Sequence, residues 1–184
     1  MKTFQLGGTL REGVGKKATN AVRNNGNIPC VLYGGSTNIT FQVTSGDVRK
    51  LVYTPEIFLV ELTIDGKQYS AIMKDLQFHP VSDKLLHIDF YEVSNEKPVE
   101  IAVPVRLEGL AEGVKAGGKL QQNLRLIKVK GLVNHIPEQL KINVEDLGLG
   151  KTIQIIDLSF PNLILTTPKT AIVATVNATR ATKK

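Results

Sequence analysis

The stretch LREGVGKKATNAVRNNGNIPCVLYGG, residues 10 to 35, decides the fold of this chain. Three small apolar residues within it recur at helical spacing: Ala18, Ala21 and Val22. Gly26 follows them, at the place where the first residue after a helix is commonly glycine. An apolar run from Ile28 to Leu32 then leads to Tyr33 and a pair of glycines. The stretch therefore predicts a basic arm, a short basic helix, a buried strand and a tight glycine turn.

Four cations, Arg11, Lys16, Lys17 and Arg23, are grouped in this stretch against a single acid, Glu12. Such grouping on one short element is typical of a protein that binds a polyanion. A solvated helix face carries similar charges, so the cations alone leave both interpretations open. The neighbouring turn at Gly34 favours the polyanion, because backbone without a side chain can approach a phosphate closely.

Composition narrows the class of partner. The 184 residues are 42% hydrophobic and carry a net charge of +6, with a pI of about 9.4. A basic balance favours nucleic acid before a membrane surface. No run approaches the ~20 apolar residues of a membrane span, and the N-terminus lacks a signal-peptide core. The single cysteine, Cys30, lies in an apolar strand and is predicted to be a buried thiol. These features predict a soluble cytoplasmic protein with no membrane partner.

Two domains are expected, because aromatic residues are concentrated in the first half of the chain and net positive charge in the second half. Nine of its ten aromatic residues lie at or before Tyr91. The polar segment EVSNEKP, residues 92 to 98, follows and ends in proline, as a linker does. The predicted parts are a binding domain at 1–93, a second domain at 94–178 and a basic tail at 179–184, with Arg180, Lys183 and Lys184 in a disordered segment.

The first domain reads as mainly β, a small barrel-like sheet with two short helices. Phe4, Leu6 and Leu10 share one parity in a first strand, in which Gly7 and Gly8 suggest a bulge. Further strands are predicted at 28–33, 39–43, 58–64, 68–74 and 85–92, with a hairpin at Asp65-Gly66. Ser45 is a candidate cap for a helix that carries Val48, Leu51 and Val52.

The last of these strands, LLHIDFYE, holds the most specific polar pair. Leu86, Ile88 and Phe90 share one parity, predicted to face the core, while Leu85, His87, Asp89 and Tyr91 are predicted to share the outward face. A catalytic pair would need a nucleophile, and a metal site would need a third ligand at a recognisable spacing. No motif supplies either one. Two interpretations remain: His87 and Asp89 form a hydrogen-bonded pair at the surface with no further role, or they form hydrogen bonds to the bases or riboses of an RNA.

At this point the sequence resembles a known family. GKKATNAVRNNGNIPCVLYGG (15–35), KDLQFHP (74–80) and LLHIDFYEV (85–93) are similar to the signatures of bacterial large-subunit ribosomal protein twenty-five, also called the general-stress or CTC family. The resemblance implies a six-stranded β-barrel with helices that binds 5S rRNA. It also implies that the partner region is loop E.

Carried across residue by residue, the resemblance gives a predicted RNA-binding set: Arg11, Lys16, Lys17, Arg23, Tyr33, Gly34, Gln77, His87 and Asp89. Gln77 is the weaker member, and Lys17 stands where the family usually has a small residue. Asn20, Asn24, Asn27 and Phe78 stand where the family commonly has a basic residue. Fewer charge-assisted phosphate contacts are then available, although asparagine can still donate to a phosphate oxygen.

The second domain is predicted to be β-rich as well, with about five strands and little helix. Val99 to Leu107 alternate without interruption, and Pro104 suggests an edge strand. Gly109 to Gly118 are expected to form a loop with short turns, and residues 171–176 to close the sheet. GLGKT at 148–152 resembles part of a phosphate-binding loop but lacks its first glycine, so it is predicted to be a turn. His135 is predicted to lie at the surface. Long members of the family carry such a C-terminal domain.

The sequence therefore predicts a non-enzymatic, ribosome-bound protein of the large subunit that contacts 5S rRNA and neighbouring ribosomal proteins. No catalytic residue, metal, cofactor or small-molecule substrate is expected. Two rival classes stay open: a stress-induced protein-interaction protein with secondary RNA binding, and a tRNA-binding accessory β-barrel.

Overall fold

A computed structural model describes residues 1–94 and 96–179 of the chain. It divides into two compact units, Met1–Lys97 and Pro98–Lys184. Each unit is described by itself below. The predicted disordered tail with Arg180, Lys183 and Lys184 lies outside the described residues.

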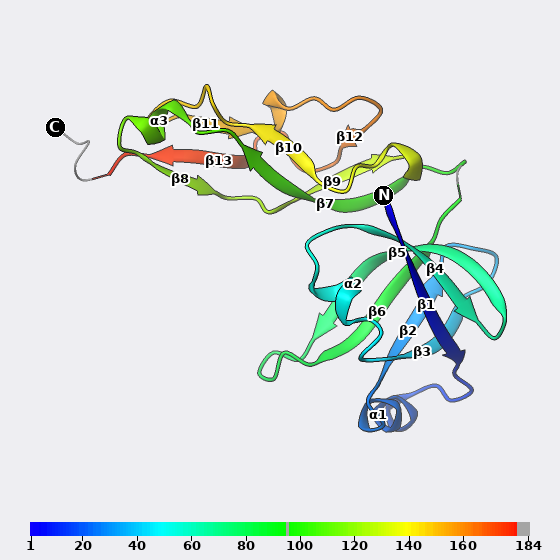
Figure 1. Cartoon of the computed structure of the whole chain (residues 1–184). Coiled ribbons are helices and arrows are strands. Elements are labelled where there is room, and N and C mark those ends of the chain that lie inside the picture. Colours follow the sequence, from blue (N-terminus) through cyan, green and yellow to red (C-terminus); the bar gives the residue numbers. More distant parts are fainter. Residues whose placement is uncertain (95, 180–184) are drawn as a thin grey trace. The chain divides into compact units, whose positions relative to one another are not determined.

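The first unit is a closed barrel of six strands with two short helices (Figure 1). The predicted fold class is confirmed. Around the barrel the order is β1-β3-β2-β6-β5-β4, and the elements are β1 (Lys2–Leu10), α1 (Lys16–Asn24), β2 (Asn27–Tyr33), β3 (Ile39–Thr44), α2 (Arg49–Tyr53), β4 (Phe58–Ile64), β5 (Lys67–Phe78) and β6 (Leu85–Glu92). The predicted C′ glycine is confirmed too, since Gly26 follows the cap residue Asn25 with a φ of 76°.

The predicted bulge in β1 is wrong. β1 pairs with β4 in parallel and in unbroken register, from Lys2 opposite Phe58 to Gly8 opposite Ile64. Glycine is needed at position 8 for a different reason. A Cβ there would lie 2.6 Å from the ring of Phe41, a fully buried core residue. The glycine therefore lets an aromatic side chain pack directly on the strand that closes the barrel.

The hairpin between β4 and β5 is confirmed. Asp65 and Gly66 both have positive φ, 46° and 79°, as a two-residue turn with the twist of its strands requires. β5, however, runs to Phe78, beyond the predicted end near Lys74. A register shift between Met73 and Asp75 makes Lys74 an extra residue against β6. Because the bulge interrupts the alternation of side chains, the sequence pattern ends there although the strand continues.

β6 has the predicted bounds, and Ile88 and Phe90 are fully buried as predicted. The prediction for Leu86 is wrong. A second register shift pairs Gln77 with His87 but Phe78 with Leu85, which leaves Leu86 as the extra residue. The predicted outward direction of Leu85 is wrong as well: because the bulge reverses the parity of the strand, Leu85 packs against the core in place of Leu86.

The proposed helix cap at Ser45 is also wrong. Turns with hydrogen bonds from the Asp47 amide to the Thr44 carbonyl and from the Arg49 amide to the Gly46 carbonyl occupy this segment. α2 begins only at Arg49, and its N-cap residue Val48 makes no side-chain capping bond. Val48 and Leu51 are both buried, so apolar packing and not capping fixes this short helix.

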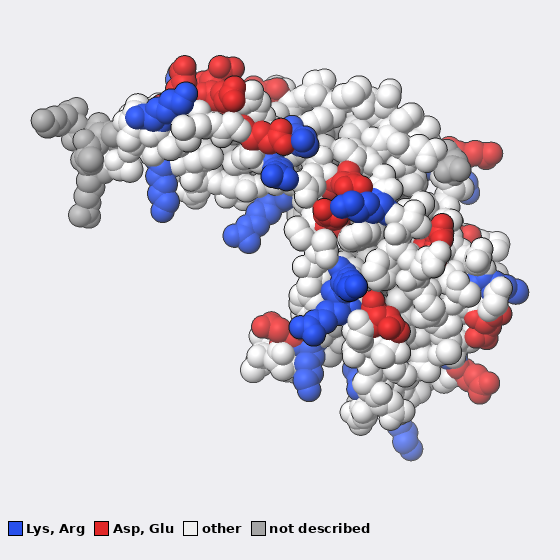
Figure 2. Space-filling model, viewed as in Figure 1, with Lys and Arg blue, Asp and Glu red and all other residues white. Residues whose placement is uncertain are grey.

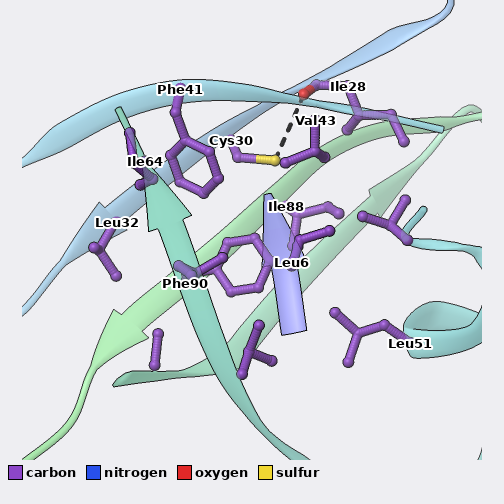
Figure 3. Close-up of a cluster of buried hydrophobic side chains, with 14 residues drawn as sticks. Leu6, Ile28, Cys30, Leu32, Phe41, Val43, Leu51, Ile64, Ile88 and Phe90 are labelled. Atoms are coloured by element: carbon purple, nitrogen blue, oxygen red, sulfur yellow. Dashed lines mark hydrogen bonds between the residues drawn. The ribbon is translucent and has the colours of Figure 1, made fainter. Parts of the chain in front are cut away.

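The barrel core is apolar and tightly interleaved (Figure 3). The rings of Phe41 and Phe90 lie 5.7 Å apart, from strands that are not adjacent in sequence. Cys30 is a free, buried thiol, as predicted, and its Sγ lies 3.5 Å from the Ile28 carbonyl oxygen. Burial raises the pKa of this thiol far above its ordinary value, so it stays protonated and unreactive.

The second unit is β-rich, as predicted, but its described part, residues 98–179, has seven strands in two sheets and not about five in one. The four-stranded sheet has the order β10-β7-β9-β12 and the three-stranded sheet the order β11-β13-β8. Their bounds are β7 (Val99–Glu108), β8 (Lys119–Gln122), β9 (Leu126–Gly131), β10 (Leu140–Asn143), β11 (Thr152–Gln154), β12 (Ile164–Leu165) and β13 (Ile172–Asn177).

Pro104 does not mark an edge strand, because β7 lies between β9 and β10. β9 pairs with β7 up to Pro104, whereas β10 pairs only from Val105 onward. The Val105 amide donates to the Arg125 carbonyl on the β9 side, so the nitrogen of Pro104 points the other way, where β10 has not yet begun. The missing N–H of the proline thus removes no ladder bond.

Short helical turns complete the second unit: α3 (Glu112–Lys115), within the predicted glycine-rich loop, and the 3₁₀ turns η1 (Val133–His135) and η2 (Ile155–Asp157). Residues 148–151 form a turn, closed by the Lys151 amide on the Gly148 carbonyl, and a strand follows, as predicted. His135 is exposed, also as predicted. Among the described residues, no helix has the length and hydrophobicity to cross a membrane.

Candidate nucleic-acid interface

The outward side of three neighbouring barrel strands gathers five of the predicted RNA-binding residues. We call the surface made by Tyr33, Gly34, Gln77, His87 and Asp89 the polar face. β2 and β6 are parallel, with Tyr33 opposite Tyr91, and β5 is antiparallel to β6, with Gln77 opposite His87. The neighbours Ile88 and Phe90 point into the core, which turns His87 and Asp89 outward as predicted. Strand pairing therefore brings together residues from three distant segments.

His87 and Asp89 form the centre of the polar face. Nδ1 of the imidazole lies 2.7 Å from Oδ1 of the carboxylate, and the two side chains are 24% and 26% exposed. An ionised carboxylate only accepts hydrogen bonds, so Nδ1 carries the proton and donates it. In a neutral imidazole Nε2 is then left as an acceptor directed away from Asp89. The pair offers fixed hydrogen-bonding positions for a ligand.

Tyr33 stands beside this pair. Its ring meets that of Tyr91 edge to face, with centroids 5.6 Å apart. Burial raises the pKa of the Tyr33 hydroxyl, and the negative charges of Asp89 and Asp75 raise it further. Tyr33 is therefore a neutral hydrogen-bond donor at physiological pH. Its ring edge and its hydroxyl are both suited to contact a nucleotide.

Gly34 follows Tyr33 with a φ of 100°, a conformation that side chains strongly disfavour. A Cβ at this position would also lie 2.6 Å from the Tyr91 ring. The glycine thus holds the aromatic pair in place. Packing against Tyr91 already explains why glycine is required at position 34. The close approach of a phosphate to this glycine is an additional role, which stays a prediction.

The basic residues at the start of α1 form a second group, which we call the basic end and define as Arg11, Lys16 and Lys17. Figure 1 shows α1 at one end of the barrel. Lys16 and Lys17 are exposed, and no acidic residue lies in the first turn of the helix. Cations there oppose the helix dipole, at a cost of about 0.3–1 kcal/mol each. An anionic partner would remove this unfavourable interaction.

Arg11 is more structural than the sequence suggested. Its Nη2 donates to Thr19 Oγ1 at 3.0 Å and to the Gly13 carbonyl at 3.3 Å, so it ties the arm before α1 to the helix. Its Nε is buried and has no hydrogen-bond partner within the described residues. Arg11 therefore fixes the basic end and adds charge to it.

Arg23, in the last turn of α1, connects this helix to β6 next to the polar face. Its Nε and Nη2 donate to the Leu86 carbonyl at 3.2 and 3.1 Å, and Nη1 donates to Asn20 at 3.4 Å. Leu86 is the bulged residue of β6, whose carbonyl is free for such a contact. Arg23 thus docks α1 onto the barrel beside His87, a role that the sequence pattern did not predict.

Two further residues adjoin the site, although neither belongs to the predicted RNA-binding set; Tyr91 was expected on the outward face and Asp75 was not. Asp75 pairs with Asp89 across β5 and β6, and Tyr91 pairs with Tyr33. The continuation of β5 beyond its bulge would have revealed Asp75. On the side shown in Figure 2, basic and acidic side chains of the barrel unit are interspersed over a largely uncharged surface. The five residues of the polar face include one acid and no lysine or arginine, so this face is suited to specific hydrogen bonding more than to electrostatic attraction.

Among the described residues, no three His, Cys, Asp or Glu side chains are grouped as metal ligands would be. The first unit thus combines a closed barrel, a polar face and a basic helix end. Two family models match the chain: the Ribosomal L25p family over residues 6–90, and the C-terminal domain of ribosomal protein TL5 over residues 98–180. The class is therefore ribosomal proteins of two β-rich domains.

Relatives extend this match over the full chain. The large ribosomal subunit protein bL25 of Porphyromonas gingivalis is 55% identical over 185 residues, which cover 100% of this chain and 96% of the relative. Those of Azobacteroides pseudotrichonymphae and Bacteroides fragilis are 54% and 51% identical over 184 and 188 residues, with 100% of this chain and 97% and 96% of the relatives covered. This chain belongs to the bL25 family of large-subunit ribosomal proteins, a structural family and not an enzyme class.

Proposed function

We propose that this protein is a structural constituent of the large ribosomal subunit in the cytoplasm, and that its barrel unit binds 5S rRNA. The observation that carries the proposal is the polar face, where pairing of β2, β6 and β5 assembles five residues of the RNA-binding set implied by the family. Family membership over the whole chain supports the ribosomal location. Neighbouring ribosomal proteins are its further partners.

The two groups of residues divide the work of binding. Regular duplex RNA has a major groove too narrow for side chains, so the polar face suits a widened, irregularly paired region such as loop E. There, His87 and Asp89 contact base edges or 2′-hydroxyls, and Tyr33 donates from its hydroxyl. The basic end contacts phosphates, which positions the protein without reading sequence.

A titration of the purified full chain with 5S rRNA, beside tRNA and an unrelated RNA duplex of equal length, tests the proposal. Preferential binding of 5S rRNA and co-sedimentation with large subunits are expected. Equal affinity for tRNA would favour the accessory-barrel class. Absence from the subunits, together with weak binding to all three RNAs, would favour the protein-interaction class.

The basic end should set the salt dependence of binding. Each neutralised phosphate adds about −0.7 to −0.9 to the slope of log K against log salt concentration. Lys16 is exposed, and we expect Lys16→Ala to reduce the magnitude of the slope by roughly one unit. Lys67→Ala, at the hairpin of β4 and β5, is the charge-matched control. Equal changes in both variants would mean that Lys16 acts only through net charge.

Arg23→Ala is a less direct probe of phosphate contact, because Arg23 also anchors α1 to Leu86. Its loss should change salt dependence and the docking of the helix together.

The barrel unit should act alone. A fragment of residues 1–97 keeps all six barrel strands and every residue of the predicted RNA-binding set. We therefore expect it to fold, as judged by circular dichroism, and to bind 5S rRNA with an affinity within about threefold of that of the full chain. A threefold change in affinity corresponds to only ~0.6 kcal/mol. A folded fragment with much weaker binding would instead assign RNA contacts to the second unit.

A further inference from the structure

A groove of about 860 Å³ lies beside the polar face, bordered by the end of α1, by α2 and by the start of β6. Its apolar lining comes from five side chains, listed here: Ile28, Val48, Val52, Leu85 and Leu86. This volume lies within the range of sites that hold small organic ligands. None of the residues assigned above to RNA binding lies in the groove except Arg23.

The charges at this groove all have one sign. Arg23, Arg49 and Lys84 line it, and no acidic residue does. Asp47 and Asp83 are in neighbouring turns but outside the lining. Within residues 1–94 and 96–179, the side chains of Arg49 and Lys84 make no ion pair. Figure 2 shows basic side chains over the part of the barrel where Figure 1 places α2. Such a rim is complementary to phosphate.

An exposed aromatic pair stands at the same place. Tyr53 lines the groove and is 65% exposed, and its ring centroid lies 6.5 Å from that of Phe78, which is 40% exposed. Phe78 pairs with Leu85, another lining residue. Exposed aromatic rings beside cations are the usual means by which proteins hold an unpaired nucleotide, with the base stacked on a ring.

We propose that this groove holds one unstacked nucleotide of the RNA partner, with its base against Tyr53 and its phosphate between Arg49, Lys84 and Arg23. The inference rests on the proposed RNA-binding function and extends it to a second site. The two sites are continuous, since Arg23 reaches the carbonyl of Leu86, and His87 of the polar face is the next residue. A strand leaving the polar face can therefore enter the groove.

Two experiments on the full chain test this inference. In the first, Tyr53→Ala should weaken binding to 5S rRNA roughly tenfold, whereas Tyr53→Phe, which keeps the ring, should bind like the unmodified protein. Arg49→Ala and Lys84→Ala should each weaken binding and reduce the salt slope by about one unit, unlike Lys67→Ala. Circular dichroism checks that each variant is folded.

In the second, Tyr53→Trp introduces the only tryptophan of the chain. Its fluorescence should be quenched when 5S rRNA stacks on it, and that of Gln68→Trp, at an exposed position of β5 outside the groove, should not. Suppose Asp89→Ala weakens binding while all groove variants bind normally and the fluorescence of Tyr53→Trp stays unchanged. This result would overturn the proposal that the groove holds RNA, and it would leave the proposed function of the polar face intact. An unmodified protein that fails to bind 5S rRNA would overturn both.

Discussion

Replacing Phe90 with alanine is expected to lower the free energy of unfolding of the barrel unit by about 3–5 kcal/mol, the usual loss for a buried phenylalanine. Phe90 is fully buried in β6 and packs against Phe41 of β3, so its removal leaves a cavity in the middle of the barrel (Figure 3). Urea denaturation followed by circular dichroism measures the change.

Phe78→Ala is the matched control for this prediction, because Phe78 is 40% exposed and lies in the neighbouring strand β5. The same deletion of a ring there should cost less, since a large part of this side chain is already exposed to water. Equal losses in the two variants would contradict the burial of Phe90. If Phe90→Ala does not fold at all, Phe90→Leu keeps part of the side-chain volume and should show an intermediate loss of stability.

Replacing Asp89 with alanine is expected to weaken specific binding of 5S rRNA by about 1–3 kcal/mol, or roughly 5- to 150-fold. A carboxylate is unfavourable beside phosphates, so its place on the polar face indicates hydrogen bonds to base amino groups or 2′-hydroxyls. The substitution also removes the acceptor that orients the imidazole of His87 at 2.7 Å. One substitution therefore removes the carboxylate of Asp89 and also leaves the imidazole of His87 without the group that orients it.

Binding of an unrelated duplex to Asp89→Ala should stay equal or become stronger, because a negative charge has been removed. Asp89→Asn separates the two effects: it removes the charge but keeps an oxygen that can accept from Nδ1 of His87. A melting curve should move little, since changes at the surface usually stay within about 0.5 kcal/mol. A large loss of thermal stability, or an equal loss of affinity for both RNAs, would mean that Asp89 is a structural residue.

Local features of the fold could be predicted from sequence because neighbouring residues determine them. The bounds of β6, the hairpin at Asp65-Gly66 and the glycine after α1 all follow from side-chain period or from backbone freedom at one position. The two-residue period of a strand also places His87 and Asp89 on the outward face. The central polar pair of the candidate site can therefore be predicted from the sequence alone.

The errors share a different origin, which is pairing between strands that are distant along the chain. The extra residues Lys74 and Leu86 exist only relative to a partner strand, so no period within β5 or β6 reveals them. Pro104 predicts an edge strand because proline is disfavoured inside sheets, yet neither partner strand of β7 needs a hydrogen bond from the nitrogen of this residue.

The order of residues along the chain already specifies most of the barrel elements, the outward direction of His87 and Asp89, and the grouping of cations near α1. Only the tertiary structure shows that Asp75 lies opposite Asp89 and Tyr91 opposite Tyr33, that Arg23 docks α1 onto the Leu86 carbonyl, and that a cationic groove borders them. This division arises because hydrophobic period acts over a few residues, whereas barrel closure and bulges set which distant side chains meet.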